Sequence, residues 1–280
     1  MLDLREAWSE LIERRPGLSS SVHAYGRVFE AWVEASPPAA PLGWTEEDCR
    51  RSWANGIPLA VAAPPDIASA AIEDLLGLAM EIVGGVRDDA AVALGRLAEQ
   101  WDRGEVTPGS LLATPGRVAA LPIPGLDESI TAFLAIVALR PSLQGYLDAC
   151  RAHLRDADWD RGVCPFCGAP PGFAEVIEDG RRRLACHVCG GAWTFRRLRC
   201  PFCGDDATRN LGRLDFEAPA DQGYFISTCA RCRGYVKELD QRVRWNGGPP
   251  LVEDWGSPHF DLACVRAGYQ RPAGPVILAG

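Results

Sequence analysis

The sequence predicts an α+β protein, with a helical N-terminal domain followed by two small β modules of zinc-ribbon type. Up to about residue 155, apolar residues such as Leu4, Trp8 and Leu11 recur at helical spacing. After residue 160, short apolar runs alternate with glycine and aspartate turns, and eight of the 11 cysteines fall in four Cys-x-x-Cys pairs. The 280 residues, 47% of them hydrophobic and 24% charged, suffice for two globular domains.

Apolar periodicity predicts several helices in the N-terminal half. They are expected from residue 4 to Pro16, over 22–33, near 45–54, from Asp66 to about 83, and from Asp88 to Gly104. Two more are expected over 129–139 and 141–155, divided at Pro141, which is favoured in a first helical turn. The glycine- and proline-rich stretch 106–125 is expected to connect helices. These apolar stripes indicate core packing, and the region contains no catalytic constellation.

Strand signals occur twice in the C-terminal half. The first set covers 174–177, 183–185 and 193–198, with Asp179-Gly180 as a hairpin turn between the first two. The second set covers 211–216, 224–228 and 235–239. The recurrence indicates an internal duplication of one small β unit.

The four cysteine pairs predict two metal sites. The spacings are C-x₂-C-x₁₈-C-x₂-C and C-x₂-C-x₂₅-C-x₂-C, the first inside the usual zinc-ribbon window and the second slightly beyond it. Four thiolates complete a tetrahedron that suits either zinc or iron. We therefore expect the following metal ligands: Cys164, Cys167, Cys186, Cys189, Cys200, Cys203, Cys229 and Cys232.

The arrangement of the pairs leaves some alternatives. Sequential pairing gives each half its own hairpin and ion, but a cross-braced pairing or a redox-active Cys-x-x-Cys stays open. A glycine after the second cysteine permits a positive φ, and three pairs have it directly, whereas Gly234 comes one residue late. His187 is interpreted as a bystander, because four cysteines already fill the first site. Cys49, Cys150 and Cys264 are interpreted as core residues.

The balance of acidic and basic residues changes near residue 160, just before the first cysteine pair. Residues 1–160 carry 13 arginines and 24 acidic residues, whereas residues 161–280 carry 16 basic and 13 acidic residues. Six arginines near the first site suggest either a nucleic-acid patch or an offset to thiolate charge, namely Arg181, Arg182, Arg183, Arg196, Arg197 and Arg199. The net charge of −8 disfavours nucleic acid, since phosphate binding depends on surplus positive charge.

No targeting or membrane signal is visible in the sequence. The charged start lacks the apolar core of a secretory signal, and no run approaches the roughly 20 apolar residues of a membrane helix. We therefore expect a cytoplasmic protein without membrane insertion. In a reducing cytosol, paired cysteines indicate metal ligands before disulfides.

The C-terminal half resembles the formate dehydrogenase accessory proteins, the FdhE family. The resemblance is carried by VCPFCGAPPGFAEVIEDGRRRLACHVCGGAWTFRRLRCPFCG (163–204), LGRLDFEAP (211–219), TCARCRGYVKELD (228–240) and the tail HFDLACVRAGYQRP (259–272). Trp255-Gly256-Ser257-Pro258 departs from the regular tail helix that the family would suggest. Each Cys-x-x-Cys pair forms a tight turn that we call a knuckle. The four knuckles occur in the family's order, so their eight cysteines match its metal-binding cysteines.

The resemblance implies a fold and a role. It implies a helical domain over 1–158, rubredoxin-like four-cysteine modules over 159–198 and 199–245, and a tail over 246–280 that packs on the modules. It also implies a non-enzymatic accessory protein that binds the immature catalytic subunit of a molybdenum or tungsten formate dehydrogenase in the cytosol and assists its assembly or activation. Iron is the metal usually linked to such sites, and zinc fits the same ligands.

Other functions remain open from the sequence. A rubredoxin-like redox protein and a zinc-ribbon nucleic-acid-binding protein are the alternatives, and the sequence does not decide whether the chain forms a homodimer. A hydrolase or transferase has no support, because there is no phosphate loop, HExxH or nucleophile elbow.

Overall fold

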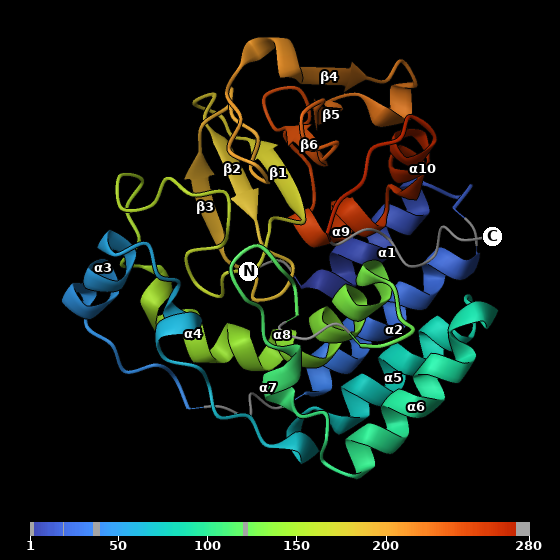
Figure 1. Ribbon diagram of the computed structural model, residues 1–280. Coiled ribbons are helices and arrows are strands. Elements are labelled where there is room, and N and C mark those ends of the chain that lie inside the picture. Colours follow the sequence, from blue (N-terminus) through green and yellow to red (C-terminus); the bar gives the residue numbers. More distant parts are fainter. Residues whose placement is uncertain (1–2, 19, 36–39, 120–122, 273–280) are drawn as a thin grey trace.

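The computed structural model describes residues 3–18, 20–35, 40–119 and 123–272, and it has a helical part beside a single sheet (Figure 1). This confirms the predicted α+β class. The helices are α1 Leu4–Arg14, α2 Ser20–Glu34, α3 Glu46–Ala54, α4 Leu59–Ala62, α5 Glu73–Gly84, α6 Ala91–Asp102, α7 Pro108–Leu111, α8 Glu128–Arg151, α9 Pro250–Trp255 and α10 Pro258–Arg266. The strands are β1 Phe173–Val176, β2 Arg182–Ala185, β3 Ala192–Phe195, β4 Leu211–Asp215, β5 Tyr224–Cys229 and β6 Tyr235–Asp240.

The start of α5 differs from the prediction. Asp66 was expected to begin this helix, but a one-turn 3-10 helix at Ser69–Ala71 intervenes and α5 starts at Glu73. The residue before the helix, Ile72, is only 1% exposed and has a non-helical φ of −124°. No side chain caps α5 at this position, so its start coincides with the burial of Ile72 and not with a cap from Asp66.

The two helices expected on either side of Pro141 are one helix, α8, and the predicted break was wrong. Proline lacks the N–H that would bond the carbonyl of Val137, four residues earlier. The indole Nε1 of Trp32 in α2 donates to that carbonyl instead, at 2.9 Å. The continuous helix fits because most of its residues are buried in the core.

Helix α8 is also long and apolar enough to span a membrane by length and composition. No membrane segment is expected from the sequence, because Pro141 divides this apolar stretch. In the fold, 83% of the most apolar 18-residue window is buried inside the protein, and core helices pass the same test. The feature is therefore weak evidence for a membrane span.

The six strands form one sheet in the order β3-β2-β1-β6-β5-β4. Each half is an antiparallel three-stranded meander, and the halves join through the parallel pair of β1 and β6, with Ala174 opposite Glu238. Both meanders follow the same chain order of knuckle, two strands, knuckle and strand. The predicted internal duplication is confirmed, and the two copies lie edge to edge.

Within the described part of the tail, up to residue 272, helix α9 lies between the sheet and the helices (Figure 1). Helix α9 contacts both α1 and β1, and the ring of Trp255 stacks on Tyr25 with 4.5 Å between centroids. The same indole lies beside Phe29, Trp32 and Phe133 of the helical part. The domain boundaries at 158, 198 and 245 stay a prediction, but the tail expected to pack on the modules also packs on the helices.

Candidate metal centres

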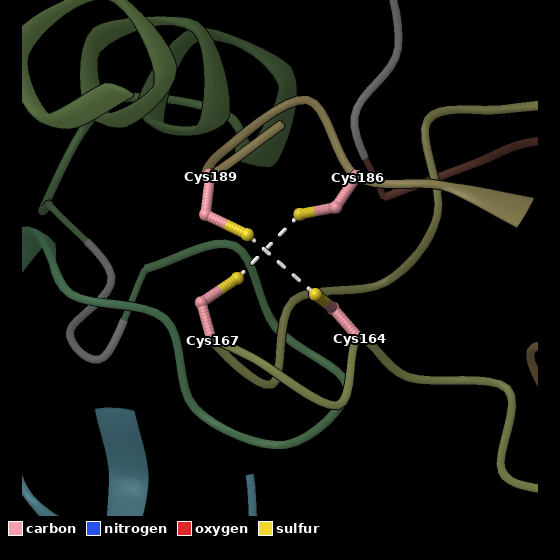
Figure 2. A group of neighbouring side chains, drawn as sticks. All are labelled: Cys164, Cys167, Cys186 and Cys189. Carbon is pink, nitrogen blue, oxygen red and sulfur yellow. Dashed lines mark hydrogen bonds between the residues drawn. The ribbon is translucent and has the colours of Figure 1, made fainter. Parts of the chain in front are cut away.

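The first cysteine group lies where two knuckles of the first meander meet. Figure 2 shows the sulfurs of Cys164, Cys167, Cys186 and Cys189 pointing toward one another. The Sγ atoms of Cys164 and Cys189 are 3.6 Å apart, and those of Cys167 and Cys186 are 3.5 Å apart. The knuckles therefore pair sequentially, as predicted, and not in the cross-braced arrangement.

The second group repeats this geometry. Its Sγ–Sγ distances are 3.6 Å for Cys200 and Cys232 and 3.7 Å for Cys203 and Cys229. In each group all four sulfurs lie within 4.8 Å of one another. A tetrahedral ion with metal–sulfur bonds of about 2.3 Å needs sulfurs about 3.8 Å apart. Both groups could thus hold one metal ion each, and the donor set suits zinc and iron equally.

The backbone conformation of each knuckle explains why its two cysteine sulfurs point toward the centre of the group. In the first knuckle the N–H of Gly168 donates to the carbonyl of Cys164 at 2.9 Å, and the N–H of Cys164 donates to Ala169 at 2.8 Å. Gly168 has φ 86°, and the equivalent glycines of the next two knuckles have φ 71° and 73°, as expected. The fourth knuckle differs, because Arg233 itself adopts φ 58° one residue before Gly234.

Thiol pKa values show what a metal ion would displace. Burial raises the pKa of Cys164 and Cys167 well above the ordinary thiol value. Burial also raises the pKa of Cys200, and it raises the pKa of Cys232 to about 11. Burial opposes ionisation of Cys189 too, but contacts with the three neighbouring sulfurs lower its pKa below the ordinary value. Burial likewise opposes ionisation of Cys229, but hydrogen bonds from the backbone of its knuckle outweigh burial and lower its pKa. A metal ion must therefore displace protons at least from the four thiols whose pKa values are raised.

The helical part holds the first group in place through contacts that the sequence did not predict. Trp53 Nε1 donates to the carbonyl of Pro165 at 3.0 Å, and the N–H of Ala60 donates to Phe166 at 2.8 Å. From α8, the guanidinium of Arg140 donates to the carbonyl of His187, and that of Arg151 donates to Cys189. Burial lowers the pKa of Arg140 to about 10, against the opposing effect of nearby sulfurs.

A buried ionic cluster connects the first group to the tail. The only lysine of the sequence, Lys237, lies 2.9 Å from Asp254 and 2.6 Å from Asp261, while Arg271 contacts both carboxylates at 2.9 Å. His187 Nε2 lies 3.0 Å from Asp254 Oδ2. Its ring thus bonds to a carboxylate outside the cysteine group, in agreement with its interpretation as a bystander. The single lysine of the sequence, placed in a predicted strand, was the one sequence signal for this cluster.

The remaining candidates behave as structural residues. Cys49, Cys150 and Cys264 are buried, which confirms that they are core residues. The arginines near the first site have local partners: Arg182 pairs with buried Glu238 at 2.6 Å, and Arg183 pairs with Glu175 at 2.8 Å. The others contact Asp156, Asp160, Asp179 or a backbone carbonyl. These pairings use much of the positive charge that a nucleic-acid patch would need.

A cavity of about 190 Å³ lies beside the second group. Cys200 and Cys229 line one side of it, and Arg182 and Glu238 also contribute to its wall. Because Cys200 and Cys229 are among its lining residues, the second group is next to this cavity.

Similarity to known proteins supports the resemblance. The chain is 36% identical to an FdhE homolog from Stutzerimonas stutzeri over 125 residues, covering 43% of this chain and 39% of the relative. It is 29% identical to an FdhE homolog from Aquifex aeolicus over 153 residues, covering 52% and 51%. These alignments span about half or less of the relatives' length. No protein-family model matches the chain.

A solved structure extends the similarity to the whole fold. The crystal structure of the FdhE protein from Pseudomonas aeruginosa matches with a TM-score of 0.61 and 22% identity, covering 99% of this chain and 95% of that one. At this identity the match establishes the fold. Together with the sequence matches, it supports the predicted FdhE family.

Proposed function

We propose that this chain, which the comparisons relate to the FdhE family, is an accessory protein. It assists the assembly or activation of formate dehydrogenase by binding the immature catalytic subunit of that enzyme. The observation that carries this proposal is the combination of the FdhE fold with two four-cysteine groups in one continuous sheet. The formate dehydrogenase partner is inferred from the family resemblance.

In this proposal the chain binds a protein and does not catalyse a reaction. The eight cysteines hold two ions, iron or zinc, and each ion contributes folding free energy on the order of 10 kcal/mol. The ions fix the knuckles, and the parallel pair of β1 and β6 holds both meanders in one rigid sheet. Buried Lys237 is held in ion pairs with two carboxylates, as a structural group is, and is not directed at a cavity that could hold a substrate among the described residues. The protein acts in the cytoplasm, does not insert in the membrane and does not use nucleic acid as its ligand.

The test is complementation in a host that makes formate dehydrogenase. A strain carrying only the Cys164→Ala, Cys167→Ala variant should lose formate dehydrogenase activity while still producing the catalytic subunit. Cys264→Ala is the matched control, because it removes a buried thiol that lies outside both groups. Full activity with the double variant, at equal accessory-protein level, would count against the proposal.

A rubredoxin-like redox protein is the second candidate. It is favoured by one observation: Cys203 is exposed, so an iron ion in the second group would lie close to solvent and to a redox partner. An iron-loaded protein should then show a thiolate-to-iron absorption that bleaches reversibly on reduction. A colourless zinc protein isolated from its host would exclude this function.

A further inference from the structure

The two cysteine groups share their ligand geometry but not their surroundings. All four cysteines of the first group are buried, and they belong to the same core cluster as residues of α2 and α8. In the second group Cys200 and Cys229 are also buried, but Cys203 is exposed and Cys232 is half-buried. We propose that the first group holds its metal ion permanently, whereas the second group is an exchange site that releases and accepts a thiophilic ion.

The first group is closed by elements far away in sequence. Trp53 in α3 and Ala60 in α4 bond the first knuckle, and Arg140 and Arg151 in α8 bond the second. The N–H of Gly116 also donates to Gly168 at 3.1 Å. Displacing any one of these sulfurs requires the helical part to separate from the sheet. That opening costs a large part of the global free energy of unfolding.

Beyond the backbone hydrogen bonds of its own knuckles and strand β5, the second group is supported by arginine side chains near the surface. Arg199 Nε donates to the carbonyl of Gly204 at 3.3 Å, and Arg233 Nε donates to Gly268 at 3.1 Å. Arg231 lies 4.0 Å from Asp205 and is largely exposed. The cavity of about 190 Å³ reaches this group on the side of Cys200 and Cys229. Release of the Cys203 and Cys232 sulfurs, the two that are not buried, therefore disrupts only local contacts near the surface.

Metal exchange at such a site proceeds by stepwise ligand replacement. An incoming thiolate or chelator binds the ion as the Cys203 sulfur leaves, and the released cysteine takes up a proton. Repeating the step at the other three cysteines transfers the ion with no change in its oxidation state. This inference rests on the metal binding proposed above and is independent of the formate dehydrogenase partner.

The experiment follows zinc release from the full-length, zinc-loaded protein to the chelator 4-(2-pyridylazo)resorcinol. We expect two zinc ions per chain, one released at least about tenfold faster than the other, because local opening is far less costly than global opening. N-ethylmaleimide added in parallel, with peptide mass mapping, should label the second group during the fast phase. Release in one phase, or early labelling of Cys164 or Cys186, would overturn the proposal, as would a protein that binds no zinc.

A pair of variants tests the cause of the difference. Trp53→Phe keeps an aromatic ring beside Phe166 but removes the donor to Pro165, so it should accelerate the slow phase alone. Arg27→Met removes an ion pair between α2 and α5, which involves none of the elements that bond the knuckles, and should leave both phases unchanged. An unchanged slow phase with Trp53→Phe, or a faster fast phase, would show that the helical part does not control retention.

Discussion

The indole of Trp32 donates a 2.9 Å hydrogen bond to the carbonyl of Val137, the carbonyl left without its helical partner by Pro141. A buried carbonyl without a donor costs roughly 1–3 kcal/mol. Trp32→Phe should therefore lower the free energy of unfolding by about that amount. Chemical denaturation monitored by circular dichroism measures the change.

The control for this prediction is the proline itself. Pro141→Ala restores an N–H that can bond Val137, so Trp32→Phe should cost less in that background. We expect a coupling free energy of about 0.5–3 kcal/mol from the double-mutant cycle. Additive effects would show that the Trp32 contribution comes only from ring packing.

Trp255 is predicted to stabilise the packing of the tail against the helices. Its ring is 7% exposed and lies among four aromatic rings of α2 and α8. Trp255→Ala should destabilise the protein by about 3–5 kcal/mol, through lost burial and the cavity left behind. Trp245 is 86% exposed, so Trp245→Ala should change stability by no more than about 0.5 kcal/mol. Equal effects of both substitutions on the thermal midpoint would contradict the packing.

Lys237 is predicted to be indispensable for the buried ionic cluster. Lys237→Met leaves Asp254 and Asp261 with less positive charge in a buried site, so we expect a loss of about 3–5 kcal/mol. Arg27→Met breaks an ion pair with Glu81 at the surface and should have little effect, because water screens such pairs. Denaturation of both variants in one buffer makes the comparison. A Lys237→Met protein as stable as Arg27→Met would be inconsistent with this cluster.

Metal binding should weaken as the pH falls. Because the pKa values of Cys164, Cys167, Cys200 and Cys232 are raised, the metal-free thiols keep their protons at neutral pH. Each ion releases these protons on binding, so the apparent affinity increases with pH. Zinc titrations between about pH 6 and 8, with calorimetry in buffers of different ionisation enthalpy, measure the effect. Affinity that does not vary with pH would mean that the thiols are already ionised.

The sequence predicted the local features of the cysteine half well. Strand positions, the turn glycine Gly180 and the grouping of knuckles follow from short-range spacing and turn chemistry, which the fold preserves. The fourth knuckle shows the limit, because Arg233 takes the positive φ that sequence rules assign to glycine. This arginine stacks on Tyr269 with 4.0 Å to the ring centroid, a contact with the distant tail.

Long-range contacts account for the features that could not be predicted. Pro141 predicts a helix break because the donor that replaces its N–H, Trp32, is more than 100 residues away and leaves no local signal. The same is true of Arg140 at the first cysteine group, which stands in the sequence only as the end of an apolar run. Tertiary contacts of this kind override local propensity and leave no periodic signal.

The most direct test of the central proposal is affinity purification of the tagged, full-length protein from its native host during growth on formate, after nuclease treatment. We expect the catalytic subunit of a formate dehydrogenase to co-purify with the wild type, and the Cys164→Ala, Cys167→Ala variant to lose it. Recovery of ribosomal or nucleic-acid-associated proteins without any formate dehydrogenase subunit would rule out the proposed assembly role.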